Sequence, residues 1–469
     1  MMKIIMILTI ILTVVVETIT SKEESSIITF PTSFTGFDIR KKFNPDDVKI
    51  SSFREGIKAV QSVAGILQNL FLEETINFAA NNWIISPVSL AGVFAQLLMA
   101  SRGKIHQLFI NALSIDNAGE KNHTRLEIHR ELGGLLQYFN RPQDNNNDYV
   151  LLLNSVVFLQ PEFVLKPTYK HAIWDFYNTP VIPVDFTGKS SSMNPTNIIN
   201  EWVKNVTRNR FTELMTLPIS TNLISLMANV VYFKGSWEIP FDPDYTQPGL
   251  FYKNENEKIQ VDYMYGEQEI LYGNTSDYQL IGLPYKTRQV VMYILLPNGK
   301  FSSRVAMKQF NAMASSAKLE NVTLVLPKVK LTTTISVKDA IFKYLKSFNS
   351  RKYDYGKSNK NFHDFKSHKT VGPDYSNSEK KNDFDMSEAS DDARFKIDDI
   401  LHKVSMQVDE LGTELIAATT TLVDHVGNDF IIRVNRPFLF FIRHESSEAH
   451  LFWGCVVNPT KSSKPPKKF

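Results

Sequence analysis

The stretch that most constrains this chain is residues 409–437, near its C-terminal end. Its first part, Gly412 to Thr421, is rich in small and β-branched residues, so it can form a strand but offers little apolar surface for burial. Its second part, Leu422 to Asp429, contains the turn signal Gly427–Asn428. A strongly apolar strand begins at Pro437. Long loops between strands are uncommon unless they have a function, so the stretch predicts an exposed functional loop that can also pair as a strand.

A set of short motifs follows a fixed order between residues 54 and 460. The set comprises Ile85-Ser86-Pro87-Val88-Ser89, Asn200-Glu201-Trp202-Val203, Ala228–Trp237, Leu326-Pro327-Lys328, Leu401-His402-Lys403, Glu410-Leu411-Gly412-Thr413-Glu414, Ala417-Ala418-Thr419, Asn435-Arg436-Pro437-Phe438 and Phe452–Pro459. In content and order these motifs resemble the serpin family. The resemblance implies an α+β fold with three β-sheets, about eight or nine helices and an exposed reactive loop at residues 412–433. It also implies a single domain spanning residues 51–460.

The resemblance assigns roles to three groups of residues. The first is the hinge of the loop, with Glu410, Gly412, Thr413, Glu414, Leu415, Ala417, Ala418 and Thr419. The second is a polar cluster beneath the main sheet where two strands part, with Ser86, Ser89, Asn229 and His402. The third is support for the hinge from Trp237 and from Lys328, which matches a position that pairs with the carboxylate at Glu410. An exposed ion pair of this kind contributes only ~0.2–1 kcal/mol to stability. From the residues alone, His402 could equally be a core histidine whose hydrogen bonds are satisfied.

The implied function is that of a secreted serine protease inhibitor that acts as a suicide substrate. The protease is trapped covalently when the cleaved loop inserts as a new strand, and insertion requires alternate loop residues to face the core. Leu415 and Ile416 depart from the alanine-rich hinge of the family, and Leu415 must then fit a slot shaped for a methyl group. A non-inhibitory serpin acting as a carrier, signalling or storage protein is therefore the alternative. An enzyme is not expected.

The register carried over from the family places the scissile bond between Val426 and Gly427. Lys and Arg are absent between Thr413 and Ile432, so a trypsin-like protease would leave its buried carboxylate without a cationic partner. Val426 suits the small apolar pocket of an elastase-like protease. Chymotrypsin-like proteases are also candidates, through Leu422 or Phe430.

The N-terminal residues have the layout of a secretory signal peptide. Residues 1–20 contain one lysine, a short apolar run and then small polar residues, and the run is too short for a membrane span. Residues 21–50 are polar and predict a mobile extension. Glycosylation sequons fit a secreted, extracellular protein and lie at Asn122, Asn205, Asn274 and Asn321.

Charge is unevenly distributed along the chain, whose formal net charge is +3. Residues 350–382 lack apolar periodicity and predict a disordered insertion. Within them, residues 351–382 carry eight basic and four acidic side chains, and the basic tail at residues 461–469 carries four lysines. The remaining body is acidic, which argues against a nucleic-acid-binding protein. The two basic segments are either solvated tails or a contact for a polyanion such as a glycosaminoglycan.

Motifs for enzymatic or metal chemistry are absent from the sequence. It contains no Gly-x-Ser-x-Gly, His-Glu-x-x-His or phosphate-binding loop motif. Its one cysteine, Cys455, lies in an apolar strand, which predicts an inert buried thiol and excludes both an internal disulfide and a thiolate zinc cluster. We therefore expect no metal, no cofactor and a monomer.

Two helix starts can be predicted from local residue patterns. Ser52-Phe53-Arg54-Glu55 has the form of a capping box before an apolar helical repeat. Ser86 precedes Pro87, so its side chain is expected to cap a helix that begins with proline. Two apolar runs, Leu151–Leu159 and Leu226–Phe233, predict strands buried on both faces.

Overall fold

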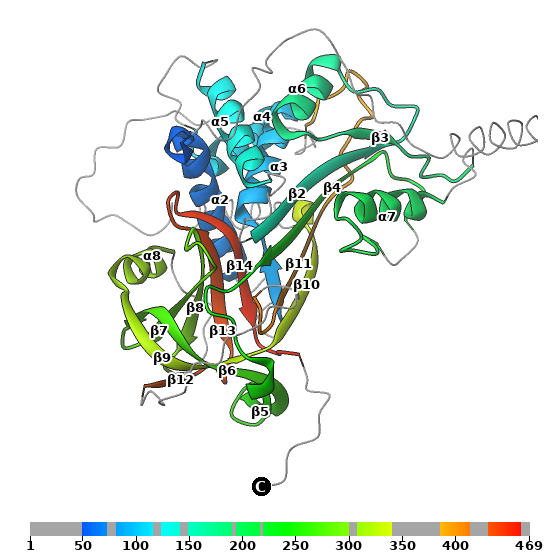
Figure 1. Cartoon of the computed structure of the whole chain (residues 1–469). Helices are drawn as coiled ribbons and strands as arrows, with labels where there is room; N and C mark the ends of the chain where they lie inside the picture. The colour runs from blue at the N-terminus through cyan, green and yellow to red at the C-terminus, as the bar shows by residue number, and fades with distance from the viewer. Residues whose placement is uncertain are drawn as a thin grey trace, which may run out of the picture. The chain divides into compact units, whose positions relative to one another are not determined.

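A computed structural model describes residues 49–72, 81–115, 123–140, 149–189, 194–215, 219–299, 307–339, 385–412 and 430–460. All of these residues belong to one compact unit that spans residues 45–469. The predicted signal peptide, nearly all of the extension at residues 21–50, the insertion at residues 350–382 and the tail at residues 461–469 lie outside the described residues. The α+β fold is confirmed, with two β-sheets and a set of helices packed against them (Figure 1).

The smaller sheet has five strands in the order β10-β11-β4-β2-β3. Its strands are β10 (Val329–Ser336), β11 (Asp399–Val408), β4 (Ser225–Gly235), β2 (Tyr149–Leu159) and β3 (Val181–Pro183). Its two central neighbours, β11 and β4, run parallel although about 160 residues separate them along the chain. β4 is buried on both faces along almost its whole length, as predicted, whereas the middle of β2 is only half-buried.

The larger sheet has nine strands. They are β1 (Trp83–Ile85), β14 (Ala449–Val456), β13 (Phe438–His444), β8 (Val290–Pro297), β7 (Tyr278–Pro284), β6 (Lys258–Asn274), β9 (Lys318–Pro327), β12 (Ile431–Arg433) and β5 (Gln247–Tyr252). The expectation of three separate sheets differs from the described strands, which form two. The reason is β6, which is 17 residues long and pairs with β5, β9 and β7 in turn, so that it joins two groups of strands.

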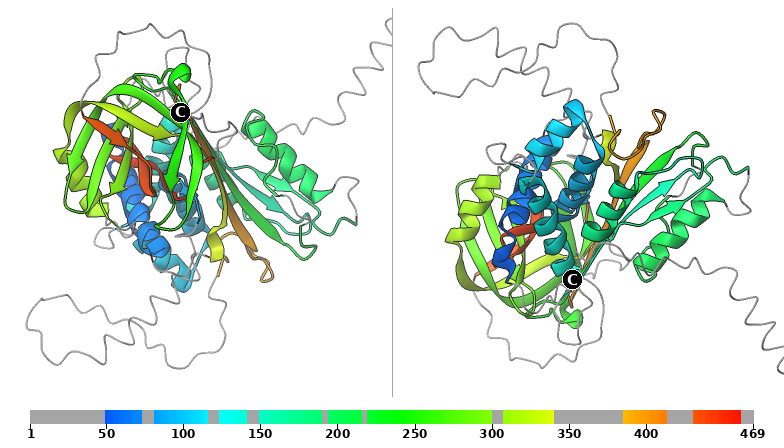
Figure 2. Two further views of the ribbon diagram at one scale, coloured as in Figure 1. Left: turned by 90° about the horizontal axis from the view of Figure 1, so that it is seen from below. Right: turned by 90° about the horizontal axis from the view of Figure 1, so that it is seen from above.

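The helices cover both faces of the five-stranded sheet (Figure 2). The described helices are α2 (Arg54–Leu72), α3 (Pro87–Ala100), α4 (Gly103–Ala112), α5 (His123–Phe139), α6 (Pro167–Tyr177), α7 (Pro195–Val206) and α8 (Met307–Ser316). Of these, α8 packs against β6 and β7 of the larger sheet. On one face, Trp202 of α7 contacts Phe158 of β2 and packs in a core with Ala228 and Val230 of β4. On the other face β4 contacts α3. Side chains alternate along a strand, so Asn229, between Ala228 and Val230, points toward α3.

The capping box predicted at the start of α2 is wrong. The Ser52 hydroxyl donates to the carbonyl oxygen of Lys49 instead of capping the helix. A carboxylate oxygen of Glu131, on α5, accepts hydrogen bonds from the backbone N–H groups of Glu55 (2.6 Å) and Gly56 (3.3 Å). A charge-assisted cap from a distant helix has displaced the local one.

The cap predicted at the start of α3 is also wrong in its chemistry. Ser86 does occupy the position before the helix, and Pro87 is its first residue. The Ser86 hydroxyl, however, donates to the carbonyl oxygen of Leu451 on β14 at 2.8 Å, so it ties the helix start to the larger sheet. Ser86 thus links elements rather than satisfying its own helix.

Candidate functional site

The candidate site lies along the boundary between β11 and β4. The two strands are paired from Asp399–Leu226 to Ser405–Tyr232, and the pairing stops there although both strands continue. The middle of this paired stretch lies over a buried polar cluster, and the C-terminal ends of the two strands are closed by the turn that follows β11. Both regions contain residues that the resemblance singled out.

The buried cluster, hereafter the Asn229 cluster, consists of Ser86, Ser89, Ser155, Asn229 and His402. The amide oxygen of Asn229 accepts from the Ser89 hydroxyl (2.8 Å) and from the His402 imidazole (2.6 Å). The Asn229 amide nitrogen donates to the Ser155 hydroxyl at 2.9 Å. Asn229 and His402 are adjacent partners across the parallel strands, so one hydrogen-bond network links β2, β4, β11 and α3.

The tautomer of His402 follows from its partners. The backbone N–H of Ser86 can only donate, and it points at Nε2 of His402 at 3.1 Å, so Nε2 must carry the lone pair. Nδ1 then carries the proton and donates to the Asn229 amide oxygen. Burial lowers the pKa of His402 from 6.5 to about 3, and a proton on Nε2 would face the Ser86 N–H. His402 is therefore neutral near pH 7.

The carboxylate of Glu410 is held in the turn at the C-terminal ends of the two strands. Lys328 Nζ donates to its two oxygens at 2.9 and 2.8 Å, and the Thr246 hydroxyl donates at 2.7 Å. Burial raises the pKa of Glu410, but the hydrogen bonds from Lys328 and Thr246 outweigh this effect and leave the pKa below its ordinary value. The expectation of an exposed pair is wrong, because the Glu410 side chain is only 10% exposed. Loss of the Lys328–Glu410 ion pair should therefore lower the stability of the protein by more than loss of a surface ion pair.

Asp409 to Gly412 form a tight turn that Trp237 clamps. Asp409 N donates to Gly412 O at 2.8 Å, and Gly412 N donates to Asp409 O at 3.2 Å. The indole N–H of Trp237 donates to Asp409 O, and its backbone N–H donates to Leu411 O. Asp409 is buried, and this burial raises its pKa, an effect that its hydrogen bonds from Leu411 and Gly412 oppose.

Gly412 sits where only glycine fits. Its φ is 140°, and a Cβ atom there would lie 2.0 Å from the carbonyl oxygen of Gly235. Gly412 forms antiparallel bridges with both Asp409 and Ser236, which directly follow β11 and β4. It therefore lies between the C-terminal ends of these two parallel strands, paired to the chain on each side.

Several predicted site residues cannot be placed. The remaining hinge residues, the proposed scissile bond and one sequon lie outside the described residues; they are Thr413, Glu414, Leu415, Ala417, Ala418, Thr419, Val426, Gly427 and Asn122. The asparagines of the other sequons, Asn205, Asn274 and Asn321, are exposed. Cys455 is fully buried, and burial raises the pKa of its thiol, so the prediction of a buried thiol is confirmed.

Sequence reasoning missed Ser155, Thr246 and Asp409. Ser155 and Thr246 are isolated polar residues whose partners lie far away in the chain, so no local pattern marks them. Asp409 did carry a signal, because an aspartate three residues before a glycine is typical of a tight turn.

Membrane spans and metal sites are two further features that a chain of this kind could carry. Within the described residues, no helix is long and apolar enough to cross a membrane. Nor do the histidine, cysteine and acidic side chains of that same part of the chain gather into a group of three or more that could hold a metal ion.

Comparisons with known proteins agree with this architecture. The profile of the family described as Serpin (serine protease inhibitor) matches residues 61–459. Serpin A3-2 of Bos taurus is 26% identical over 398 residues, which cover 84% of this chain and 87% of that protein. Corticosteroid-binding globulin of Ovis aries is 26% identical over 397 residues, and the match covers 82% of this chain and 82% of that protein.

Solved structures show the same fold. Human thyroxine-binding globulin has a TM-score of 0.70 at 21% identity, and the match covers 87% of this chain and 100% of that chain. The mouse protein Z-dependent protease inhibitor has a TM-score of 0.70 at 22% identity, and the match covers 88% of this chain and 100% of that chain. The relatives include inhibitors and hormone carriers, and serpins in general are protease inhibitors, mostly extracellular, rather than enzymes. This chain belongs to the serpin family.

Proposed function

We propose that this protein is a secreted inhibitor of extracellular serine proteases that acts as a suicide substrate. The protease serine Oγ attacks the carbonyl carbon of Val426, and the bond from that carbon to the Gly427 nitrogen breaks. The protease histidine transfers the serine proton to the leaving nitrogen, so Gly427 becomes a new N-terminus. Val426 remains bound to the protease as an ester. Insertion of the freed segment then carries the protease away before water hydrolyses this ester.

The position of Gly412 is the observation that carries the proposal. An inserting strand must enter between β11 and β4 and run antiparallel to both. Gly412 already forms antiparallel bridges to the residues that follow these two strands. The turn from Asp409 to Gly412 reverses the chain direction, so the backbone of Gly412 runs antiparallel to both strands. Gly412 thus has the geometry of the first residue of such a strand.

The proposed partner is an elastase-like or chymotrypsin-like protease. Val426 fits a small apolar pocket, and Thr413–Ile432 offers no cation to a trypsin-like pocket. Secretion is supported by the layout of residues 1–20 and by the exposed sequon asparagines Asn205, Asn274 and Asn321. Residues 351–382 and the basic tail at residues 461–469 are the proposed contacts for a polyanion.

A non-inhibitory carrier is the second candidate. The observation in its favour is the pair Leu415 and Ile416, which departs from the small residues of an inhibitory hinge. Inhibition is a race between insertion and hydrolysis, and ~1.4 kcal/mol on the insertion barrier slows insertion tenfold. Under this alternative the loop is cut like an ordinary substrate, and the protease is released.

The test is to incubate the purified protein with an elastase-like, a chymotrypsin-like and a trypsin-like protease. We expect a covalent complex with the first or second that survives denaturant, and a released peptide whose N-terminus is Gly427. The cleaved protein should also melt at a markedly higher temperature than the intact one, because insertion completes the sheet.

Two variants make the test specific. Thr413→Arg should still be cleaved but should form no complex, because its unpaired charge cannot enter the core cheaply. Leu415→Ala should raise the ratio of trapped to cleaved protein. Cleavage by all three proteases without a complex or a rise in melting temperature would contradict inhibition and favour the carrier.

A further inference from the structure

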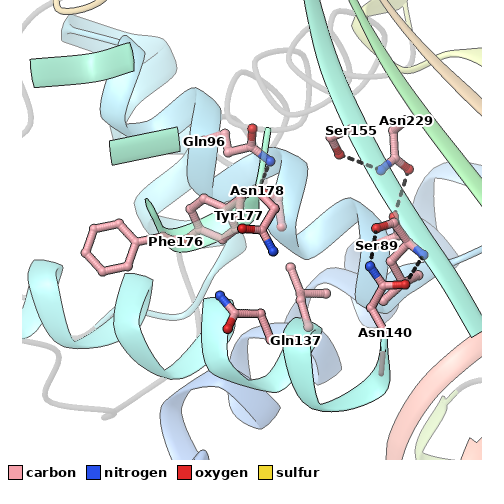
Figure 3. A pocket seen from close by; sticks show the side chains of 12 residues that line it. Ser89, Gln96, Gln137, Asn140, Ser155, Phe176, Tyr177, Asn178 and Asn229 are labelled. Carbon is pink, nitrogen blue, oxygen red and sulfur yellow. Dashed lines mark hydrogen bonds between the residues drawn. The ribbon is translucent and has the colours of Figure 1, made fainter. Parts of the chain in front are cut away.

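A small polar cavity lies between α3, α5, α6 and strand β2 (Figure 3). Its volume is about 30 Å³. The polar side chains that line it include Ser89, Gln96, Gln137, Ser155, Asn178 and Asn229. Three of these, Ser89, Ser155 and Asn229, belong to the Asn229 cluster, so the cavity adjoins that network directly.

Gln96 lines this cavity and carries an unsatisfied amide oxygen. The side chain is 1% exposed, and its amide nitrogen donates to Gly92 O within the same helix at 3.3 Å. Its amide oxygen is buried and has no hydrogen-bond partner among the described residues. Rotating the amide would bring two oxygens together at Gly92, so the orientation is set by the helix. A buried acceptor without a donor is costly, which points to a partner that is not part of the chain.

The cavity has the size and chemistry for water. About 10–15 Å³ suffices for one water molecule, provided that two to four polar groups surround it. The volume of about 30 Å³ is therefore enough for about two water molecules and too small for an organic ligand. Gln96, Gln137 and Asn178 all line the cavity, and each carries an amide group that can bind water (Figure 3).

The lining connects the protein surface with its interior. Asn178 is exposed and Gln137 is half-buried, whereas Ser89 and Asn229 at the other end are only 2% and 1% exposed. Water molecules at Gln96 would lie between these two ends. The cavity is thus a short polar passage that reaches the Asn229 cluster from the helix side of the sheet.

We propose that this cavity holds about two ordered water molecules, bound to Gln96, that hydrate the Asn229 cluster from behind. When β4 and β11 separate, Asn229 loses its bond to His402, and a neighbouring water can take the vacated position. The hydration site stands on the structure alone. Its role in strand separation rests on the proposed function.

The experiment compares the wild-type protein with Gln96→Leu, which places an apolar side chain of similar size at this position and removes the amide. Oxygen-17 magnetic relaxation dispersion counts long-lived internal water molecules, and a crystal structure of the wild type locates them. We expect the count to fall by one or two in Gln96→Leu. The matched control is Gln107→Leu, the same change at an exposed position on α4, which should leave the count unchanged.

A dry cavity in the wild-type crystal structure, or an unchanged count in Gln96→Leu, would overturn the hydration site. This result does not depend on protease inhibition. The role is tested separately from the rate at which cleaved protein gains heat resistance, which we expect to be several-fold lower in Gln96→Leu. If Gln96→Leu has lost its water but gains heat resistance at the wild-type rate, the proposed role of the water in strand separation is wrong, whereas the hydration site itself still stands. If Gln96→Leu does not fold, the wild-type crystal structure still decides whether the site exists.

Discussion

The middle of the β11–β4 boundary and its C-terminal end are held together by opposite kinds of chemistry. The Asn229 cluster is neutral, four of its five members are almost completely buried, and both hydrogen bonds of His402 depend on one tautomer. The Glu410 end is ionic, and Lys328 remains 33% exposed. A neutral buried network fails when one partner is removed, because water cannot replace it easily. A partly exposed ion pair can be exchanged for water, which suits the end where a strand would first enter.

The largest effect is expected from Asn229→Ala. This change removes the acceptor for both Ser89 and His402, and each buried group left unpaired costs about 1–3 kcal/mol. The free energy of unfolding, measured with guanidinium chloride, should therefore fall by about 3 kcal/mol or more. The exposed change Gln107→Ala should leave it nearly unchanged. Equal effects at the two positions would show that the cluster does not hold the strands.

Gly412→Ala should produce the next largest effect. Because the new Cβ would lie 2.0 Å from the Gly235 carbonyl oxygen, the turn must open or shift. Strained backbone of this kind costs about 1–3 kcal/mol. We expect a change in Trp237 fluorescence, since its indole is bonded to the turn, together with a lower melting temperature. Gly299→Ala, where a Cβ meets no neighbour, is the control. Wild-type fluorescence in Gly412→Ala would contradict the close approach.

Lys328→Met should weaken the contacts that hold Glu410, with a smaller loss in the free energy of unfolding than the two changes above. It leaves the Glu410 carboxylate with Thr246 as its remaining side-chain donor, and partial exposure limits the cost to about 1–2 kcal/mol. The pKa of Glu410 should rise, and proteolysis at the turn should become faster. Lys328→Arg keeps the charge and should restore most of the protection. If Lys328→Met and the wild type are cut equally fast, the pair does not close this end.

His402 should make the stability of the protein sensitive to acid, with an effect that is small close to pH 6.5. Its folded-state pKa of about 3 lies below the ordinary 6.5, so the unfolded chain binds the proton first. Its contribution to stability is therefore complete above about pH 6.5 and is lost as the pH falls toward 3, by at most ~1.4 kcal/mol per pH unit. In His402→Gln, the dependence of the unfolding free energy on pH should be weaker by the amount that corresponds to about one bound proton. Denaturant unfolding at pH 7 and pH 5 measures it, and equal slopes would contradict the neutral tautomer.

Motifs in the sequence were enough to identify the fold class and to bring Ser86, Ser89, Asn229 and His402 into one hypothesis. The apolar run at Leu226–Phe233 was enough for a strand buried on both faces, because such a run has no solvent-facing side. The caps of α2 and α3 were not predictable. Glu131 comes from a distant helix to cap α2, and the carbonyl oxygen of Leu451 on β14 accepts the Ser86 hydroxyl that was expected to cap α3, so both outcomes depend on partners brought in by folding.

The sequence by itself determined that residues 409–437 can be either loop or strand, because small and β-branched side chains permit both states. The tertiary structure decided what holds the base of that loop. Gly412 is enclosed by Gly235 and Ser236, and Glu410 is satisfied by Lys328 and Thr246. These contacts join residues more than 80 positions apart, so their geometry depends on how the sheets and helices pack. Local propensity carries no information about such distances, and this is why the sequence marked the loop but not its clamp.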